Sequence, residues 1–210
     1  TKESSLVKVT GVIEIAAGGS LAIHAGVQVV FTTSNSGILN LGGSLLILGN
    51  PSKRVILEPL SQEKGGDSEW NGIKFESTAI AASFSLVSGT ELDVAYVQGS
   101  VFQYVDIVRA GKPTNRYTYG LEFNNASPYI FDVKMIAGGG YNGKAIYVTT
   151  LQFYFVARYL KVIKSNDASS YTTYNPVGIY GVGRNTGIVV IDTMSIISGR
   201  QRSLHIQSVS

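Results

Sequence analysis

The chain reads WNGIKF at residues 70–75, and related stretches recur as YGLEF at 119–123, GKAIYV at 143–148 and VGIYG at 177–181. A second apolar segment follows each of them: YVDIV at 104–108, DVKMI at 132–136, YLKVI at 159–163 and TMSII at 193–197. Short strand pairs that recur roughly every 25–35 residues are typical of a solenoid, in which each repeat forms one coil and packs against the next. The sequence therefore predicts a fold more directly than a function, because many activities occur on one scaffold.

Alignment of the repeats predicts which side chains face the interior, since side chains alternate along a strand. In the first strand type, one inward column holds Ile73, Leu121, Ile146, Ile179 and Leu204, and the other holds Phe75, Phe123, Val148, Gly181 and Ile206. The outward column between them holds Lys74, Glu122, Tyr147, Tyr180 and His205. Stacking then predicts that Lys74 lies beside Glu122 and that Tyr147 lies beside Tyr180.

The second strand type aligns in the same way. Its inward columns are Val105/Val133/Leu160/Met194 and Ile107/Met135/Val162/Ile196, and its outward column is Asp106/Lys134/Lys161/Ser195. Opposite charges therefore meet again, because stacking places Asp106 beside Lys134.

The first sixty residues continue the pattern with short strands broken by glycine pairs. GGSLAI at 18–23 and GGSLLI at 42–47 are nearly identical and lie 24 residues apart, which indicates successive turns of one coil. We count about seven coil starts, near residues 11, 37, 72, 120, 145, 178 and 203. The interval from 72 to 120 is too long for a plain coil, so residues 76–100 hold either an insertion or an extra turn. Residues 1–210 are predicted to form a single domain.

Composition supports an all-β chain with essentially no α-helix. No segment of 10–12 residues shows a sustained 3.6-residue apolar period. Charged residues make up only 15% of the chain, against about 25% in an average domain. Apolar runs end before 18 residues, so no membrane insertion is expected, and the absence of cysteine excludes disulfides. The chain starts at Thr1 without a methionine, and we expect a fragment or a protomer of a longer assembly.

The series GGSLAIHAGVQVVF, GGSLLILGNPSKRVILEP, WNGIKF and YVDIVRAG resembles the right-handed parallel β-helix of the pectin-lyase-like superfold. Within it, the chain is most similar to the non-enzymatic extracellular β-helix repeats of the bark beetle family of animal adhesion proteins and of related bacterial surface proteins. The resemblance covers nearly the whole chain. It implies a right-handed β-helix and a location outside the cell or on its surface.

Enzymatic, metal-binding and nucleic-acid-binding functions are not predicted. Enzymes of the superfold cluster their carboxylates on one coil face, whereas Asp93, Asp106, Asp132 and Asp192 occur one per coil here. The loop at 164–167 has no acidic residue after it to complete a calcium site. The glycine-rich stretch at 138–144 precedes no helix, so it does not form a phosphate loop. We predict no cofactor, and no basic stripe for nucleic acid.

The loops that join the second strand of one coil to the next coil carry the candidate binding residues. They are expected to line one edge of the solenoid and are rich in tyrosine and arginine, which are enriched at binding surfaces. The candidates are Arg109, Arg116, Tyr117, Tyr119, Tyr141, Tyr171, Tyr174 and Arg200. Asn125 is a candidate glycosylation site, since Asn125-Ala126-Ser127 forms a sequon.

Two hypotheses for function follow. The first is a non-enzymatic extracellular structural or adhesion module that associates end to end with copies of itself, or with adjoining coils of a parent protein. It depends on the uncapped terminal strands at 12–15 and 203–206, because open strand edges template further pairing. The alternative is a carbohydrate-binding or polysaccharide-active β-helix, with a glycan as partner.

Overall fold

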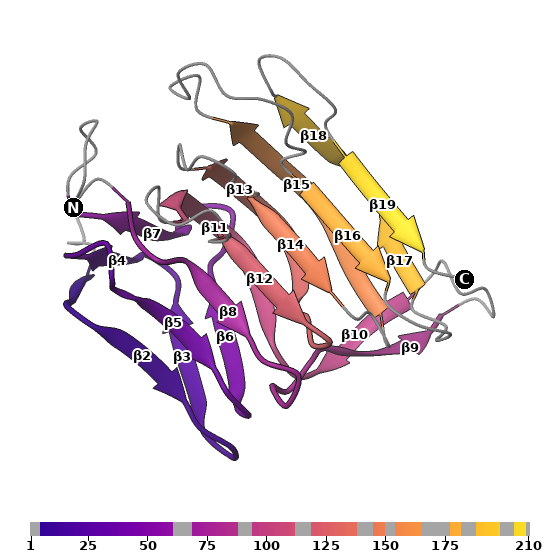
Figure 1. The fold of residues 1–210 in the computed structure, drawn as a ribbon, viewed down its shortest axis with the longest axis horizontal. Coiled ribbons are helices and arrows are strands. Elements are labelled where there is room, and N and C mark those ends of the chain that lie inside the picture. Colours follow the sequence, from indigo (N-terminus) through magenta and orange to yellow (C-terminus); the bar gives the residue numbers. More distant parts are fainter. Residues whose placement is uncertain are drawn as a thin grey trace.

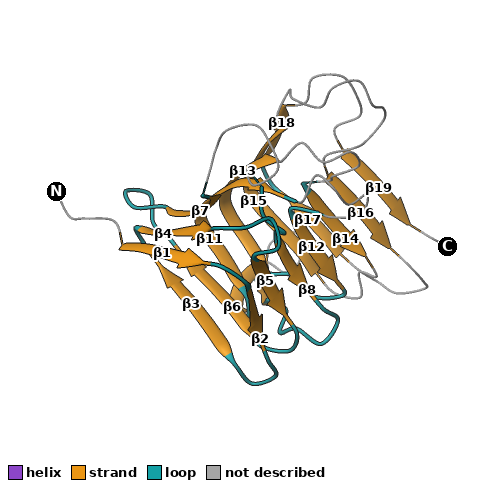
Figure 2. Cartoon of the chain, turned by 60° about the vertical axis from the view of Figure 1, so that its left-hand side comes forward, coloured by secondary structure: helices purple, strands orange, loops and turns teal. Residues whose placement is uncertain are grey.

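A computed structural model describes residues 5–60, 69–87, 94–111, 119–137, 145–149, 154–164, 177–181, 188–197 and 204–208. Within these ranges the chain is all-β, without a helix (Figures 1 and 2). The strands before residue 76 are β1 (Ser5–Val9), β2 (Val12–Ile15), β3 (Ser20–His24), β4 (Val27–Phe31), β5 (Gly37–Asn40), β6 (Ser44–Leu48), β7 (Val55–Pro59) and β8 (Ile73–Phe75). The middle strands are β9 (Ser83–Leu86), β10 (Val94–Gln98), β11 (Val101–Ala110), β12 (Leu121–Asn124) and β13 (Tyr129–Ala137). The last ones are β14 (Ile146–Thr149), β15 (Tyr154–Lys164), β16 (Val177–Gly181), β17 (Ile188–Ile191), β18 (Met194–Ile197) and β19 (Leu204–Ser208).

The strands stack as three parallel ladders. The first ladder is a seven-stranded sheet in the order β2-β5-β8-β12-β14-β16-β19. A ten-stranded sheet supplies the other two, because β11 pairs with β6 through its first residues and with β7 through its later ones. The second ladder runs β3-β6-β11-β13-β15-β17, and the third runs β1-β4-β7-β11-β13-β15-β18. Figure 1 shows the ladders extending from β2, β3 and β4 at one end of the molecule to β17, β18 and β19 at the other.

A bend divides each long strand between the second and third ladders. Tyr104, Asp132 and Tyr159 lie at equivalent places in β11, β13 and β15, and their φ angles are 50°, 51° and 55°. This left-handed conformation is uncommon for residues other than glycine and turns the chain sharply. The all-β parallel architecture fits a β-solenoid, as expected. Its handedness and number of coils stay predictions.

The register confirms most of the predicted columns. Both inward columns of the second strand type and its outward column pair as expected, and Glu122 pairs with Lys74. Ile73, Leu121 and Ile146 are stacked and at most 1% exposed.

The prediction for β16 was wrong by two residues. Val177, rather than Ile179, pairs with Ile146 and Leu204, and Ile179 continues the column of Val148 and Ile206. Tyr147 consequently pairs with Gly178, not with Tyr180. A two-residue slip preserves the inward and outward faces, so the alternation of β16 could not reveal it.

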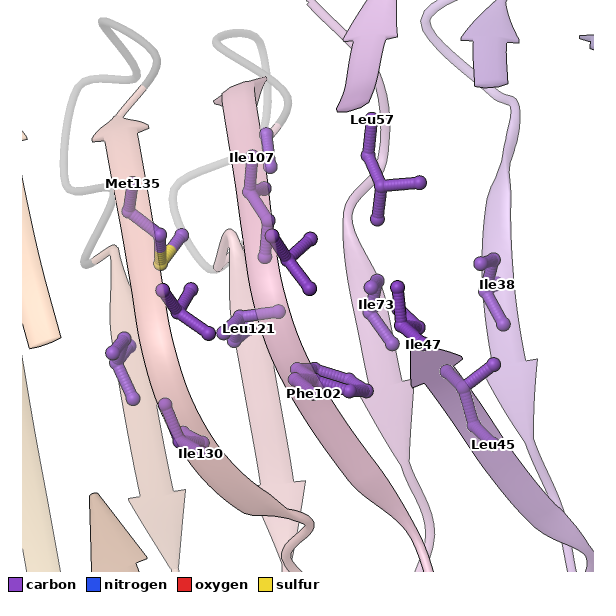
Figure 3. Packing of buried hydrophobic residues seen from close by; sticks show 14 of the residues in the cluster. Ile38, Leu45, Ile47, Leu57, Ile73, Phe102, Ile107, Leu121, Ile130 and Met135 are labelled. Atoms are coloured by element: carbon purple, nitrogen blue, oxygen red, sulfur yellow. The ribbon is translucent and has the colours of Figure 1, made fainter. Parts of the chain in front are cut away.

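Large apolar side chains fill the space between the ladders. Phe75, Phe123 and Phe155 form a chain of ring contacts, with centroids 5.4 Å and 6.3 Å apart. Phe31 and Trp70 stack in parallel at 3.9 Å, and the Trp70 indole N–H donates to the carbonyl of Val108 at 2.8 Å. Figure 3 shows side chains from all three ladders, including Ile73, Phe102 and Met135, converging on this interior. Burial of this apolar surface is the main force that holds the coils together.

The long interval between the coil starts at 72 and 120 contains an insertion. Strands β9 and β10 form an antiparallel pair of their own, which crosses the other strands near the second ladder (Figure 1). The fully buried Ser100, which follows the insertion, connects the segments around it. Its hydroxyl accepts from the Leu45 N–H at 3.1 Å and donates to the Ile80 carbonyl, just before the insertion, at 2.6 Å. Of the two alternatives, the insertion is therefore correct.

Candidate functional surfaces

Most predicted edge-loop residues lie outside the described residues: Arg116, Tyr117, Tyr141, Tyr171, Tyr174 and Arg200. Arg109 and Tyr119 are described. Arg109 lies near the end of β11 with a φ of 51°. The Tyr119 ring stacks on Tyr147 of the first ladder, with centroids 4.1 Å apart and planes 21° apart. The binding edge itself stays a prediction.

The candidate sequon lies in a tightly bonded turn. Asn125 has a φ of 55° and is half-buried, and its backbone N–H donates to the Thr149 carbonyl at 3.0 Å. Ser127 is 3% exposed, and its hydroxyl donates to the Tyr154 carbonyl at 3.0 Å. Glycosylation of Asn125 stays a prediction.

Seven aromatic side chains gather on the outside of the second ladder and its bend: Phe84, Tyr96, Tyr104, Tyr129, Phe131, Tyr154 and Tyr159. We call them the outer aromatic cluster. Phe131 stands at its centre, edge-to-face with Tyr104 at 5.5 Å and with Tyr159 at 5.6 Å. Tyr159 is 52% exposed and the other six are half-buried. The cluster therefore offers ring surface to solvent.

The insertion contributes two members of the outer aromatic cluster. Phe84 contacts Tyr129 and Tyr154 at 5.8 Å each, and Tyr96 stacks on Tyr129 at 5.6 Å. Burial raises the pKa of the Tyr96 phenol, and also that of Tyr129 although Arg158 opposes the shift there. These phenols therefore stay protonated at neutral pH and keep their O–H donors.

Sequence reasoning missed this cluster. Its available signal was the alignment of Tyr104 with Tyr159 at the bend, together with the outward position of Phe131 in its strand. The position of the β9–β10 insertion against the second ladder could not be predicted from the sequence, because no periodic pattern relates the insertion to the coils.

The carboxylates of Asp106 and Asp132 meet at one guanidinium. Arg54 donates from Nε to Asp106 Oδ1 and from Nη1 to Asp132 Oδ1, both at 2.8 Å. Its Nη2 donates to the carbonyls of Val105 and Asp132. The side chains of Arg54 and Asp106 are 26% and 27% exposed, and that of Asp132 is 41% exposed. Asp106, Asp132 and Asp192 lie in different coils, as predicted, and Asp93 lies outside the described residues. Arg54 nevertheless joins two of these aspartates. Its four bonds link three successive coils.

We predict that Arg54→Met lowers the free energy of unfolding by about 1–3 kcal/mol, because two neighbouring carboxylates lose their charge-assisted hydrogen bonds. Solvent screening of the exposed Asp132 keeps the loss below that of a buried pair. Urea unfolding followed by circular dichroism measures it. In an Asp132→Asn background the same substitution should cost less, since asparagine tolerates the left-handed conformation and carries no charge. Equal losses in both backgrounds would contradict this account.

A second charged group lies on the outer face of the first ladder. Lys74 Nζ lies 2.9 Å from Glu76 Oε1 and 3.7 Å from Glu122 Oε1. The hydrogen bond from Lys74 lowers the pKa of Glu76, whereas burial raises the pKa of Glu122 more than Lys74 lowers it. Asn124 donates to Glu76 at 3.4 Å. The predicted Lys74–Glu122 pair is present, and Glu76 is the closer partner of the lysine.

Among the described residues, no group of three or more His, Asp or Glu side chains is placed to hold a metal ion. The same part of the chain contains no helix long and apolar enough to cross a membrane. No family model matches the chain, and the comparisons with curated proteins and with solved structures found no match either.

Proposed function

We propose that this protein is a non-enzymatic structural or adhesion module, located outside the cell or on its surface, that associates end to end. In this proposal the ladders form a right-handed parallel β-helix of about seven coils, similar to the bark beetle repeats of the pectin-lyase-like superfold. Such a rod positions other surfaces at a defined spacing and gains length by stacking.

The open strand edge at the amino-terminal end carries the proposal. Within the described residues, β1 pairs only with β4, β2 only with β5, and β3 only with β6. Three strands thus present unpaired backbone groups on one side, and apolar side chains accompany them. Leu6, Val7 and Val12 are 55%, 45% and 47% exposed. Edges of this kind, with little charge to protect them, favour pairing with another strand.

The backbone of β2 shows which groups are open. Gly11 and Ile15 direct their carbonyls to β5, where they accept from the N–H groups of Gly37 and Leu41 at 3.3 Å and 2.9 Å. Successive residues of a parallel strand bond to opposite neighbours, so Val12 and Glu14 direct their N–H groups away from β5. Glu14 is also exposed, so its side chain can be changed without altering the core.

We predict that Glu14→Pro weakens self-association, because proline removes an edge donor that the coil itself does not use. Sedimentation velocity and negative-stain microscopy over a concentration series measure the loss of end-to-end species. Glu14→Ala keeps the N–H and is the matched control. The proposal fails if the wild-type chain is monomeric at every concentration, or if both variants associate like the wild type.

The outer aromatic cluster favours a second candidate function, carbohydrate binding. Exposed rings present flat apolar surfaces, and the phenol and Asp132 groups beside them can bond hydroxyls. Tyr159→Ala should lower affinity for a bound polysaccharide by about tenfold, or 1.4 kcal/mol, because it removes the most exposed ring. A glycan array with neutral, uronate and sulfated chains, followed by calorimetry, measures this. Leu41→Ala, which removes an exposed apolar side chain (37% exposed) outside both the cluster and the predicted binding edge, is the control. Absence of binding to every glycan class would reject the candidate.

A further inference from the structure

The two ends of the molecule carry complementary partial layers. Each complete layer has one strand from each of the three ladders, as with β2, β3 and β4. Among the described strands, only β1 precedes that layer, and it belongs to the third ladder because it pairs with β4. Of the same strands, only β19 follows the layer of β16, β17 and β18, and it belongs to the first ladder because it pairs with β16. The two partial layers therefore occupy different faces.

Two copies can interlock because of this difference. When one copy follows another, β19 of the first and β1 of the second share a single junction layer without overlapping. In that layer β19 gains β2 of the next copy as a neighbour, and β1 gains β18 of the preceding copy. Among the described strands none fills the second-ladder position of the junction layer, so we expect association that depends on concentration.

The register predicts which residues meet at the junction. Along the first ladder, Ile13 shares a column with Ile38 and Ile73, and the same column ends at Val177 and Leu204. The next register position of that ladder runs from Glu14 on β2 to His205 on β19 by the same pairings. Along the third ladder, the column that starts at Val7 ends at Ile196.

We infer that copies of this chain stack head to tail in the ladder register, so that His205 of one copy lies opposite Glu14 of the next. The inference rests on the proposed end-to-end association and assigns its geometry. The occupant of the open amino-terminal edge is a second copy, because the same chain presents the missing strand of the junction layer at its other end. Contacts of this head-to-tail kind produce filaments rather than closed dimers.

Engineered cysteines test the register, since the chain contains no cysteine of its own. Strands about 4.8 Å apart bring paired Cα atoms within disulfide range. The double variant Glu14→Cys/His205→Cys should therefore form a ladder of covalent multimers on a non-reducing gel. In Glu14→Cys/Gln207→Cys the second cysteine is displaced by two residues, to a diagonal distance of about 7–8 Å, and should crosslink poorly. Each single variant should give dimers at most.

The outcomes separate this inference from the proposed function. Multimers in the first double variant alone support the register. Multimers in the displaced variant, or stacked wild-type species without crosslinking in either, overturn the register and leave end-to-end association standing. A monomeric wild type at all concentrations overturns both.

Discussion

Phe123→Ala is expected to lower the free energy of unfolding by about 3–5 kcal/mol, the usual cost of removing a buried phenylalanine ring. The Phe123 side chain is fully buried, and its ring lies between those of Phe75 and Phe155. Its removal leaves a cavity that the rigid, hydrogen-bonded strands on either side cannot close. For a chain of this length the melting temperature should fall by roughly 6–20 °C.

Phe131→Ala is the matched control for this prediction. The same atoms are removed from a half-buried ring in the outer aromatic cluster. This substitution removes less buried apolar surface, and solvent can fill the space that the ring leaves. We therefore expect it to lower the free energy of unfolding by less than half as much as Phe123→Ala. Calorimetric melting of the two variants compares them directly. Equal losses would mean that the interior of the ladders is not the principal source of stability.

Gly72→Ala is expected to cost about 2–5 kcal/mol, from two separate effects. Gly72 has a φ of 86°, where an L-residue with a Cβ is strained by about 1–2 kcal/mol. A Cβ at this position would also lie 2.5 Å from the Gly120 carbonyl oxygen and 2.6 Å from that of Tyr119. These are backbone atoms of the next coil, so the clash can be relieved only if the two coils move apart. We expect this separation to cost about 1–3 kcal/mol more.

Gly18→Ala isolates the first of these effects. Gly18 has a similar φ of 74°, but no atom lies within 4 Å of the position that its Cβ would take. We expect it to cost only about 1–2 kcal/mol. Urea unfolding of the two variants measures the difference, which reports how closely the coils stack. If Gly18→Ala were as damaging as Gly72→Ala, the contact between coils would not explain the need for glycine at 72.

The charged side chains on the outer faces of the ladders have a different role from the aromatic rings there. Arg54 joins carboxylates that lie 52 and 78 positions away in the chain, so it stabilises the stacking of coils. Lys74 does the same between β8 and β12 on another face. The outer aromatic cluster is held together by ring contacts instead, such as those of Phe131 with Tyr104 and Tyr159.

The sequence by itself determined the strands of the two aligned types, their inward faces and their parallel stacking, but not β9, β10 or β17. Each of these depends on the alternation of inward and outward residues along a strand, which has a period of two and can be recognised within each strand separately. Val105, Val133 and Leu160 could be aligned from their neighbours alone, and they pair as expected. The opposite charges of Lys74 and Glu122 strengthened the same alignment.

Only the tertiary structure decided the register of β16, the docking of the β9–β10 insertion and the Arg54 contacts. A slip of two residues preserves the alternation of inward and outward positions along a strand, so only the pairing of β16 with β14 and β19 distinguishes the alternatives. The insertion follows no repeat, and its place depends on how Phe84 and Tyr96 pack against distant rings. The partners of Arg54 depend on a bend that places Asp132 beside Asp106, and no local pattern encodes a contact between side chains of different coils.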